Sequence, residues 1–138
     1  MAIQSKLISQ YIKDLSFENY AAQKNEFEHG KFDLNMDLNI KKKDLKSDLL
    51  EITINILLEA KLLKEKKFLI ELSYASTFKK NKQKSTLDEK KFAFVDCPNI
   101  MFPFVRQIVF NISQNSGFLP INLEYINFQD LFDSQMPT

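Results

Sequence analysis

A strict alternation of apolar and polar residues between positions 32 and 41 constrains the fold of this chain more than any other feature. Polar or charged residues occupy every second position, and the apolar residues between them are Phe32, Leu34, Met36, Leu38 and Ile40. A period of two places alternate side chains on opposite faces of a β-strand. The segment therefore predicts a strand in a sheet with one buried face and one face in water.

Three further segments predict strands of the same sheet. Residues 7–18 begin to alternate towards their end, where Leu15 and Phe17 share a face. Residues 50–59 and 68–74 also alternate, with Leu69 as an apolar residue on the outward side. The inward residues are Leu50, Ile52, Ile54, Ile56 and Leu58, then Phe68, Ile70, Leu72 and Tyr74. A polar connection at 19–30 follows the first strand, and short turns at 41–48 and 64–67 favour antiparallel hairpins. We expect a four-stranded antiparallel sheet, meander-like, with one apolar face.

Residues 98–116 predict a long helix that is apolar around most of its circumference. Pro98 suits a first helical turn, and Gly117 suits the end of the helix. Pro103 either kinks the helix or marks its true start. The apolar residues are too many for one stripe, namely Met101, Phe102, Phe104, Val105, Ile108, Val109, Phe110 and Ile112. A helix of this kind needs cover on two sides, so we expect another subunit to supply one of them.

An apolar connector and a short helix complete the predicted fold. Residues 118–123 cannot be helical before Pro120, so they predict an extended segment. Asn127 is the expected N-cap of a final helix with Phe128, Leu131 and Phe132 on its apolar side. Together the segments predict a single α+β domain, residues 1–138, with one long and one short C-terminal helix packed on one face of the sheet.

Composition excludes several classes of protein. A net charge of +1 gives no general attraction to nucleic acid or membranes. One cysteine excludes a disulfide framework and fits a reducing compartment. The N-terminus lacks the apolar run of a signal peptide, and no segment approaches the ~20 apolar residues of a membrane-spanning helix. We therefore expect a cytoplasmic protein without membrane insertion.

The sequence offers no catalytic or metal-binding constellation. His29, the only histidine, lies in a polar connection, which favours a solvated loop residue over a general base. Cys97 would be reactive if the start of the predicted helix lowered its thiol pKa, although a small buried residue is the favoured alternative. Two glycines cannot form a phosphate-binding loop, and one His with one Cys does not make a metal site. We expect no enzyme, no cofactor and no metal.

Two charged regions could bind partners. Residues 79–91 predict a charged loop with six lysines, but no arginine or aromatic residue interleaves them, as nucleic-acid binding usually requires. On the wet face of the sheet, the acidic residues Asp14, Glu18 and Glu71 accompany an apolar residue, Leu69. This arrangement suits docking of a basic partner, although acidic residues on a wet sheet face are also ordinary.

Four segments resemble the SecB family of protein-export chaperones. They read KDLSFE (13–18), FLIEL (68–72), CPNIMFPFVRQ (97–107) and GFLPINLEYINFQDLF (117–132), in the order that the family has them. The resemblance implies a four-stranded antiparallel sheet backed by a long and a short helix, in a homotetramer built as a dimer of dimers. It also implies an ATP-independent holdase that keeps precursor proteins unfolded and delivers them to the SecA motor.

The resemblance also implies sites. Matched by position, the SecA contacts would be Asp14, Glu18, Leu69 and Glu71. Unfolded precursor proteins would bind in apolar grooves between the sheet and the segment that joins the two helices. The residues expected to line a groove or a subunit interface are Phe102, Phe104, Phe118, Leu119, Ile121, Leu123 and Phe128. The sequence does not divide these residues among core, interface and groove.

Two alternatives remain open at this point. A SecB-like chaperone dedicated to one antitoxin would share the fold, and a nucleic-acid-binding module would use the basic segment 79–91.

The end of the sequence, SQMPT, lacks the zinc-binding tail of Cys and His residues that many members of the SecB family have. The second SecA contact made by that tail is therefore expected to be missing or replaced.

Overall fold

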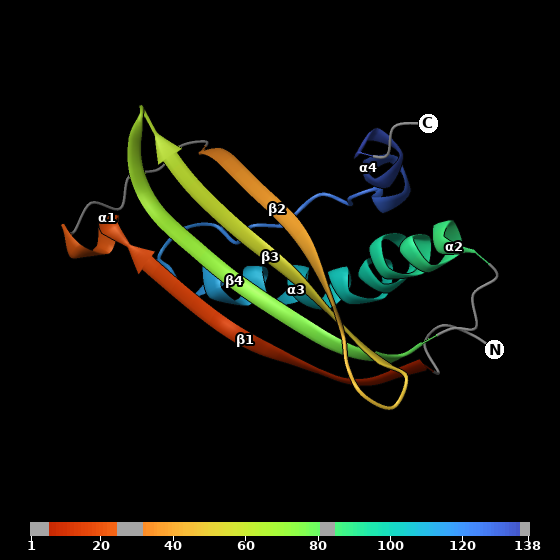
Figure 1. Ribbon diagram of the computed structural model, residues 1–138. Helices are drawn as coiled ribbons and strands as arrows, with labels where there is room; N and C mark the ends of the chain where they lie inside the picture. Colours follow the sequence, from red (N-terminus) through yellow and green to blue (C-terminus); the bar gives the residue numbers. More distant parts are fainter. Residues whose placement is uncertain (1–5, 25–31, 81–84, 136–138) are drawn as a thin grey trace.

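The computed structural model describes residues 6–24, 32–80 and 85–135, which form a four-stranded antiparallel sheet with helices against one face (Figure 1). The strands are β1 (Leu7–Asn19), β2 (Asp33–Asp44), β3 (Leu49–Leu62) and β4 (Glu65–Lys79). The predicted four-stranded antiparallel sheet is confirmed. Within it, β2, β3 and β4 form a meander of hairpins, whereas β1 pairs with β4 and not with β2. Both β1 and β2 are therefore edge strands.

The hairpin strands extend further than the sequence indicated. β2 and β4 reach into the segments 41–48 and 64–67, so the predicted turns were too long. The turns include residues with positive φ, which are Ser47 (62°), Asp48 (58°), Leu63 (52°) and Lys64 (67°). Paired positive φ values match the twist of a hairpin and normally call for Asn or Gly. None of these four residues is Asn or Gly, so the sequence lacked the usual turn signal.

The predicted faces of β3 and β4 are confirmed, because all of their inward apolar residues are buried. β1 follows a less regular pattern. Its pairing with β4 shifts between Ile12 and Asp14, which makes Lys13 an inserted residue. An inserted residue reverses the faces on either side of it. This bulge explains why β1 alternates regularly only over its second half.

A helical segment running from 86 to 114 covers the inner face of the sheet (Figure 1). It consists of α2 (Thr86–Lys91), a π-helical turn η2 (Phe92–Asp96) and α3 (Cys97–Gln114). The predicted helix start at Pro98 is therefore wrong. Pro98 has no N–H to donate, and the preceding Cys97 N–H bonds to the carbonyl of Phe92, five residues back.

The predicted charged loop at 79–91 is also wrong, since it contains the end of β4 and the whole of α2. The Ser85 side chain accepts a hydrogen bond from the Asp88 N–H at 3.1 Å and so caps α2. Acidic residues occupy the first turn of α2 and lysines the last, which suits the helix dipole. These local signals are present in the sequence and identify the true start of the helix.

The inner core lies between α3 and the two central strands. α3 contributes Met101, Val105 and Val109, each 0% exposed. Phe104, on another side of the helix, is 39% exposed, and Ile108 and Ile112 are only partly buried. A single chain therefore leaves part of the apolar surface of α3 uncovered.

The connector after α3 folds back along the helix. The Ile121 N–H donates to the Ser113 hydroxyl at 2.8 Å, and Arg106 Nε donates to the Leu123 carbonyl at 2.8 Å. The last helix is α4 (Phe128–Gln135). The side chain of Asn127 accepts from the Asp130 N–H at 3.0 Å, which confirms the predicted cap. The predicted long and short C-terminal helices are confirmed.

The polar connection expected at 19–30 begins with a short helix, α1 (Tyr20–Gln23). The side chain of Asn19 caps it by accepting from the Ala22 N–H at 3.0 Å. His29 lies outside the described residues.

Candidate functional site

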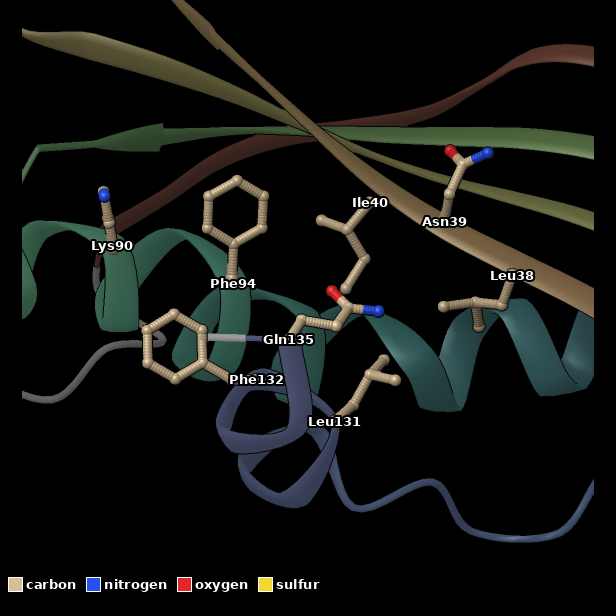
Figure 2. A pocket seen from close by; sticks show the side chains of 8 residues that line it. All are labelled: Leu38, Asn39, Ile40, Lys90, Phe94, Leu131, Phe132 and Gln135. Carbon is tan, nitrogen blue, oxygen red and sulfur yellow. The ribbon is translucent and has the colours of Figure 1, made fainter. Parts of the chain in front are cut away.

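A mainly apolar cavity of about 310 Å³ lies between the edge strand β2 and helix α4 (Figure 2). Its walls come from β2, from the segment spanning α2 and η2, and from α4. The lining residues are Leu38, Asn39, Ile40, Lys90, Phe94, Leu131, Phe132 and Gln135. The volume is at the lower end of the range for small-ligand sites. The cavity can accept apolar side chains of a bound chain.

The position of α4 keeps this cavity open. β2 has a neighbouring strand on one side only, and α4 lies beside β2, away from the centre of the sheet (Figure 1). The inward residues Met36, Leu38 and Ile40 of β2 are consequently only partly buried and Leu34 is exposed, in contrast to the buried inward residues of β3. Figure 2 shows Ile40, Phe94 and Phe132 arranged around the space between the strand and the helices. An apolar surface is thus accessible at the sheet edge.

The structure separates the seven predicted groove or interface residues into two groups. Four of them are buried in the core of the single chain, namely Phe102, Ile121, Leu123 and Phe128. Among these, the rings of Phe102 and Phe128 pack edge to face with centroids 5.6 Å apart. The other three reach the surface, Phe104 and Phe118 partly and Leu119 with 84% of its surface exposed. Phe118 also packs against the Phe32 ring, with centroids 4.9 Å apart.

None of the seven residues lines the cavity between β2 and α4. The sequence did contain part of the cavity signal, because Leu38 and Ile40 belong to the strict alternation and Phe132 to the apolar side of the last helix. These patterns predict only that the residues are buried, because no local feature of the sequence indicates that α4 lies beyond the edge of the sheet. Phe94 was missed because it fell before the predicted start of the helix.

A second candidate site lies on the outer face of the sheet. Glu18 pairs with Leu69 across β1 and β4, while the neighbouring pairs are Ser16 with Glu71 and Asp14 with Ser73. Directly paired residues of antiparallel strands lie on the same face. The structure therefore brings all four predicted docking residues together on the outer face.

The strand order adds three residues to this site. Leu57 of β3 pairs with Glu71 on one side and with Asp37 on the other. Glu59 pairs with Leu69. We call the whole set the acidic patch, and its residues are Asp14, Glu18, Asp37, Leu57, Glu59, Leu69 and Glu71. The three additions were missed because cross-strand neighbours depend on strand order, which the sequence does not specify.

The negative charge of the acidic patch is greatest at the carboxylates that have no cation beside them. Glu59 forms ion pairs with Lys61 at 3.1 Å and with Lys66 at 3.4 Å. The hydrogen bond from Lys61 is the main reason that the pKa of Glu59 is lowered. No ion pair to Asp14, Asp37 or Glu71 is present among the described residues. Leu57 is 39% exposed between carboxylates. Such a surface suits a basic segment that carries an apolar residue.

Cys97 is buried, and burial, with the nearby Asp96 carboxyl, raises the pKa of its thiol. This favours the buried structural residue over the reactive thiol. Within residues 6–24, 32–80 and 85–135, no cluster of three or more His, Cys, Asp or Glu side chains could hold a metal ion. The described part of the chain also has no helix long and apolar enough to cross a membrane.

Comparison with known proteins identifies similar sequences along the whole chain. A family model described as "Preprotein translocase subunit SecB" matches residues 1–138. The "Protein-export protein SecB" of Ruegeria pomeroyi is 32% identical, over 97% of this chain and 82% of its own length. The protein of the same description from Orientia tsutsugamushi (strain Boryong) is 36% identical, over 94% of this chain and 82% of its own length.

A solved structure supports the fold. The SecB-like chaperone of Mycobacterium tuberculosis, determined with a ChAD peptide from the HigA1 antitoxin, superimposes with a TM-score of 0.70. The superposition covers 89% of each chain at 10% sequence identity. At that identity the likeness concerns the fold alone.

Proposed function

Because this chain belongs to the SecB family of protein-export chaperones, we propose that it holds unfolded precursor proteins in apolar grooves and delivers them to SecA. Members of this family are chaperones and not enzymes. The observation that carries the proposal is the placement of two candidate sites on one sheet. The cavity opens beside β2 towards α4, whereas the acidic patch occupies the outer face. A client and a motor can therefore bind at the same time, as delivery requires.

Holding follows from burial of apolar surface. A precursor that has not folded exposes apolar segments, and their burial contributes ~25 cal/mol per Å². The cost of ordering a flexible client opposes this gain, so a single cavity of this size binds weakly. Leu38, Ile40 and Phe94 form the wall that we assign to the client, and the exposed Leu119 and Phe104 offer further apolar surface. No nucleotide is needed for such binding.

Assembly would strengthen holding. The uncovered apolar surface of α3, with Phe104 at 39% exposure, supports packing of the long helices in a homotetramer arranged as a dimer of dimers. Several cavities acting on one client chain raise its affinity through effective concentration. We place the assembled chaperone in the cytoplasm, where precursors are made.

The client site is tested by replacing cavity residues with serine. Leu38→Ser with Leu131→Ser should weaken binding of a fluorescently labelled unfolded precursor about tenfold, because the cavity loses apolar surface at two walls. Leu34→Ser is the control, since Leu34 lies on the same side of β2 but does not line the cavity. Native mass measurement of the complex reports whether the oligomer is intact. Unchanged precursor affinity in an intact double variant would exclude this cavity as the client site.

The docking site is tested by charge reversal. Asp14→Lys with Glu71→Lys should abolish SecA binding while precursor binding persists, because both changes lie on the acidic patch. The control, Glu124→Lys with Asp133→Lys, makes the same charge change at exposed positions on the connector and α4. SecA affinity is measured by titrating SecA against each variant immobilised on a surface. SecA binding that survives the Asp14 and Glu71 reversal would exclude the acidic patch as the docking site.

A further inference from the structure

The outer face of the sheet carries opposite charges at its two ends. The acidic patch occupies the end where Glu18 pairs with Leu69. Towards the other end, the strand register aligns Tyr11, Ala75, Thr53 and Lys41 in one row across the sheet, and Ser9, Thr77, Glu51 and Lys43 in the next. We call this region the basic end, and its charged residues are Lys13, Lys41, Lys43 and Glu51.

Glu51, the carboxylate in these two rows, already has partners. Glu51 accepts a hydrogen bond from the Tyr11 hydroxyl at 2.6 Å and one from Lys13 Nζ at 2.5 Å, and it is only 8% exposed. The Lys13 bond, followed by the Tyr11 bond, holds the pKa of Glu51 below its usual value, while the Glu51 bond raises the pKa of Lys13. Glu51 is therefore neutralised locally.

The lysines of β2 differ from Lys13 in this respect. Lys41 and Lys43 are exposed, and neither makes an ion pair with any residue that the structure describes. With three lysines and one glutamate, the basic end has a net charge of +2. Two cations thus remain for an external ligand.

The basic end also contains a depression in the protein surface. An open depression of about 530 Å³ is lined by four lysines and two carboxylates, so positive charge exceeds negative charge by two. The lysines are Lys13, Lys41, Lys42 and Lys43, the carboxylates are Asp14 and Glu51, and the other lining residues are Thr53, Asn55 and Ser73. The Thr53 hydroxyl and the second amide N–H of Asn55 supply hydrogen-bond donors beside the ammonium groups. The Ser73 hydroxyl already donates to Asn55 Oδ1, and the first amide N–H of Asn55 donates to Asn39 Oδ1. Asp14, Asn55 and Ser73 also line the neighbouring depression of the acidic patch, so the two regions are continuous.

We propose that the basic end binds an acidic segment of the protein partner that docks on the acidic patch. The inference rests on the proposed docking function and extends it. A partner with a basic segment followed by an acidic one matches both ends of the outer face, whereas a partner that is basic throughout is repelled at Lys41 and Lys43. The face therefore selects the order of charges along the partner as well as their sign.

The surroundings favour a protein segment over a nucleic acid. The chain's one arginine, Arg106, bonds to the connector and is not at the basic end. The aromatic ring that is present, Tyr11, is tied to Glu51 through its hydroxyl. A polyphosphate backbone long enough to continue along the face would meet the carboxylates of the acidic patch. Nucleic-acid sites instead combine continuous positive charge with free aromatic surfaces.

An oligoglutamate peptide tests the basic end directly. Its binding to the full chain should weaken about tenfold in Lys41→Glu with Lys43→Glu, and by a smaller factor in Lys41→Gln with Lys43→Gln. The control, Lys24→Glu with Lys91→Glu, makes the same charge change at exposed positions, one directly after α1 and one at the end of α2, and should leave the peptide affinity unchanged. Equal peptide affinity in the two glutamate double variants would overturn the proposal. So would tighter binding of a single-stranded oligonucleotide than of oligoglutamate at Lys41 and Lys43.

SecA binding then separates this inference from the docking function beneath it. If the proposal holds, the Lys41 and Lys43 reversal weakens SecA binding about fivefold, and the Asp14 and Glu71 reversal abolishes it. Loss of SecA binding in the acidic-patch variant with full SecA affinity in the basic-end variant would overturn the inference alone. Full SecA affinity in the acidic-patch variant would overturn the docking function itself.

Discussion

The two faces of the sheet belong to the same strands, but their side chains differ in polarity and exposure. On the inner face of β3 every residue from Leu50 to Ala60 that points to the helices is apolar and at most 3% exposed. On the outer face the alternate residues include Glu51, Asn55 and Glu59, with Leu57 as an exposed apolar exception. Folding and recognition therefore use largely separate sets of side chains on each strand. Charge on the outer face can therefore change while the core stays the same.

Two neighbouring leucines of β3 give the sharpest test of this separation. Leu58 is 1% exposed on the inner face, and Leu57 is 39% exposed on the outer face. Leu58→Ala should lower the free energy of unfolding by about 2–5 kcal/mol, because it leaves a cavity in the core. Leu57→Ala should cost less than about 1 kcal/mol. Urea denaturation measures both values, and similar losses for the two variants would show that the outer face contributes to stability as much as the inner face does.

The inner face was predictable because its signal is local. Alternation in residues 32–40, 50–59 and 68–74 assigns each side chain to a face without any knowledge of neighbouring strands. The π-helical turn before Cys97 escaped prediction for the opposite reason, since residues 92–96 have no recognised sequence pattern. Ser85 and Asp88 did offer a capping signal that would have placed the helix start correctly.

The candidate sites were less predictable because they depend on contacts distant in sequence. Asp37, Leu57 and Glu59 join the acidic patch only through the order β1-β4-β3-β2. The cavity requires α4 to lie beyond the edge of β2, a placement fixed by contacts such as that between Arg106 and Leu123. The resemblance to the SecB family gave Asp14, Glu18, Leu69 and Glu71, and the family is confirmed. Their role in docking stays a prediction.

Glu51 is the place where the outer face contributes to stability. Its carboxylate accepts from Tyr11 and Lys13, so Glu51→Gln should lower the free energy of unfolding by about 1 kcal/mol at pH 7. Because the pKa of Glu51 is lowered in the folded state, this stabilisation is complete above the unfolded-state value of ~4.3. It is lost as the pH falls through the lower folded-state pKa, so the two proteins should converge in acid.

Chemical denaturation at a series of pH values measures this convergence. Glu71→Gln serves as the control, since it makes the same change at an exposed position of the outer face. A stability difference for Glu51→Gln that persists undiminished in acid would mean that packing, and not the charged hydrogen bonds, links Glu51 to its neighbours.

The smallest expected effect concerns a polar residue on the apolar face. Ser76 of β4 pairs with Ile52, is 0% exposed, and its hydroxyl has no hydrogen-bond partner within the described residues. A buried hydroxyl without a partner costs free energy, so Ser76→Ala should leave stability unchanged or raise it by up to about 1 kcal/mol.

Ser73→Ala makes the same change three positions away on the outer face, where the hydroxyl donates to Asn55 Oδ1. It should lower stability by about 0.5 kcal/mol. Opposite signs from identical substitutions, measured by urea denaturation, would show that the faces differ in chemistry as well as in exposure. A clear loss for Ser76→Ala would instead mean that this hydroxyl is bonded in solution. Gln10 of β1, which pairs with Ser76 and whose side-chain oxygen is also buried without a partner among the described residues, is then the side chain to examine.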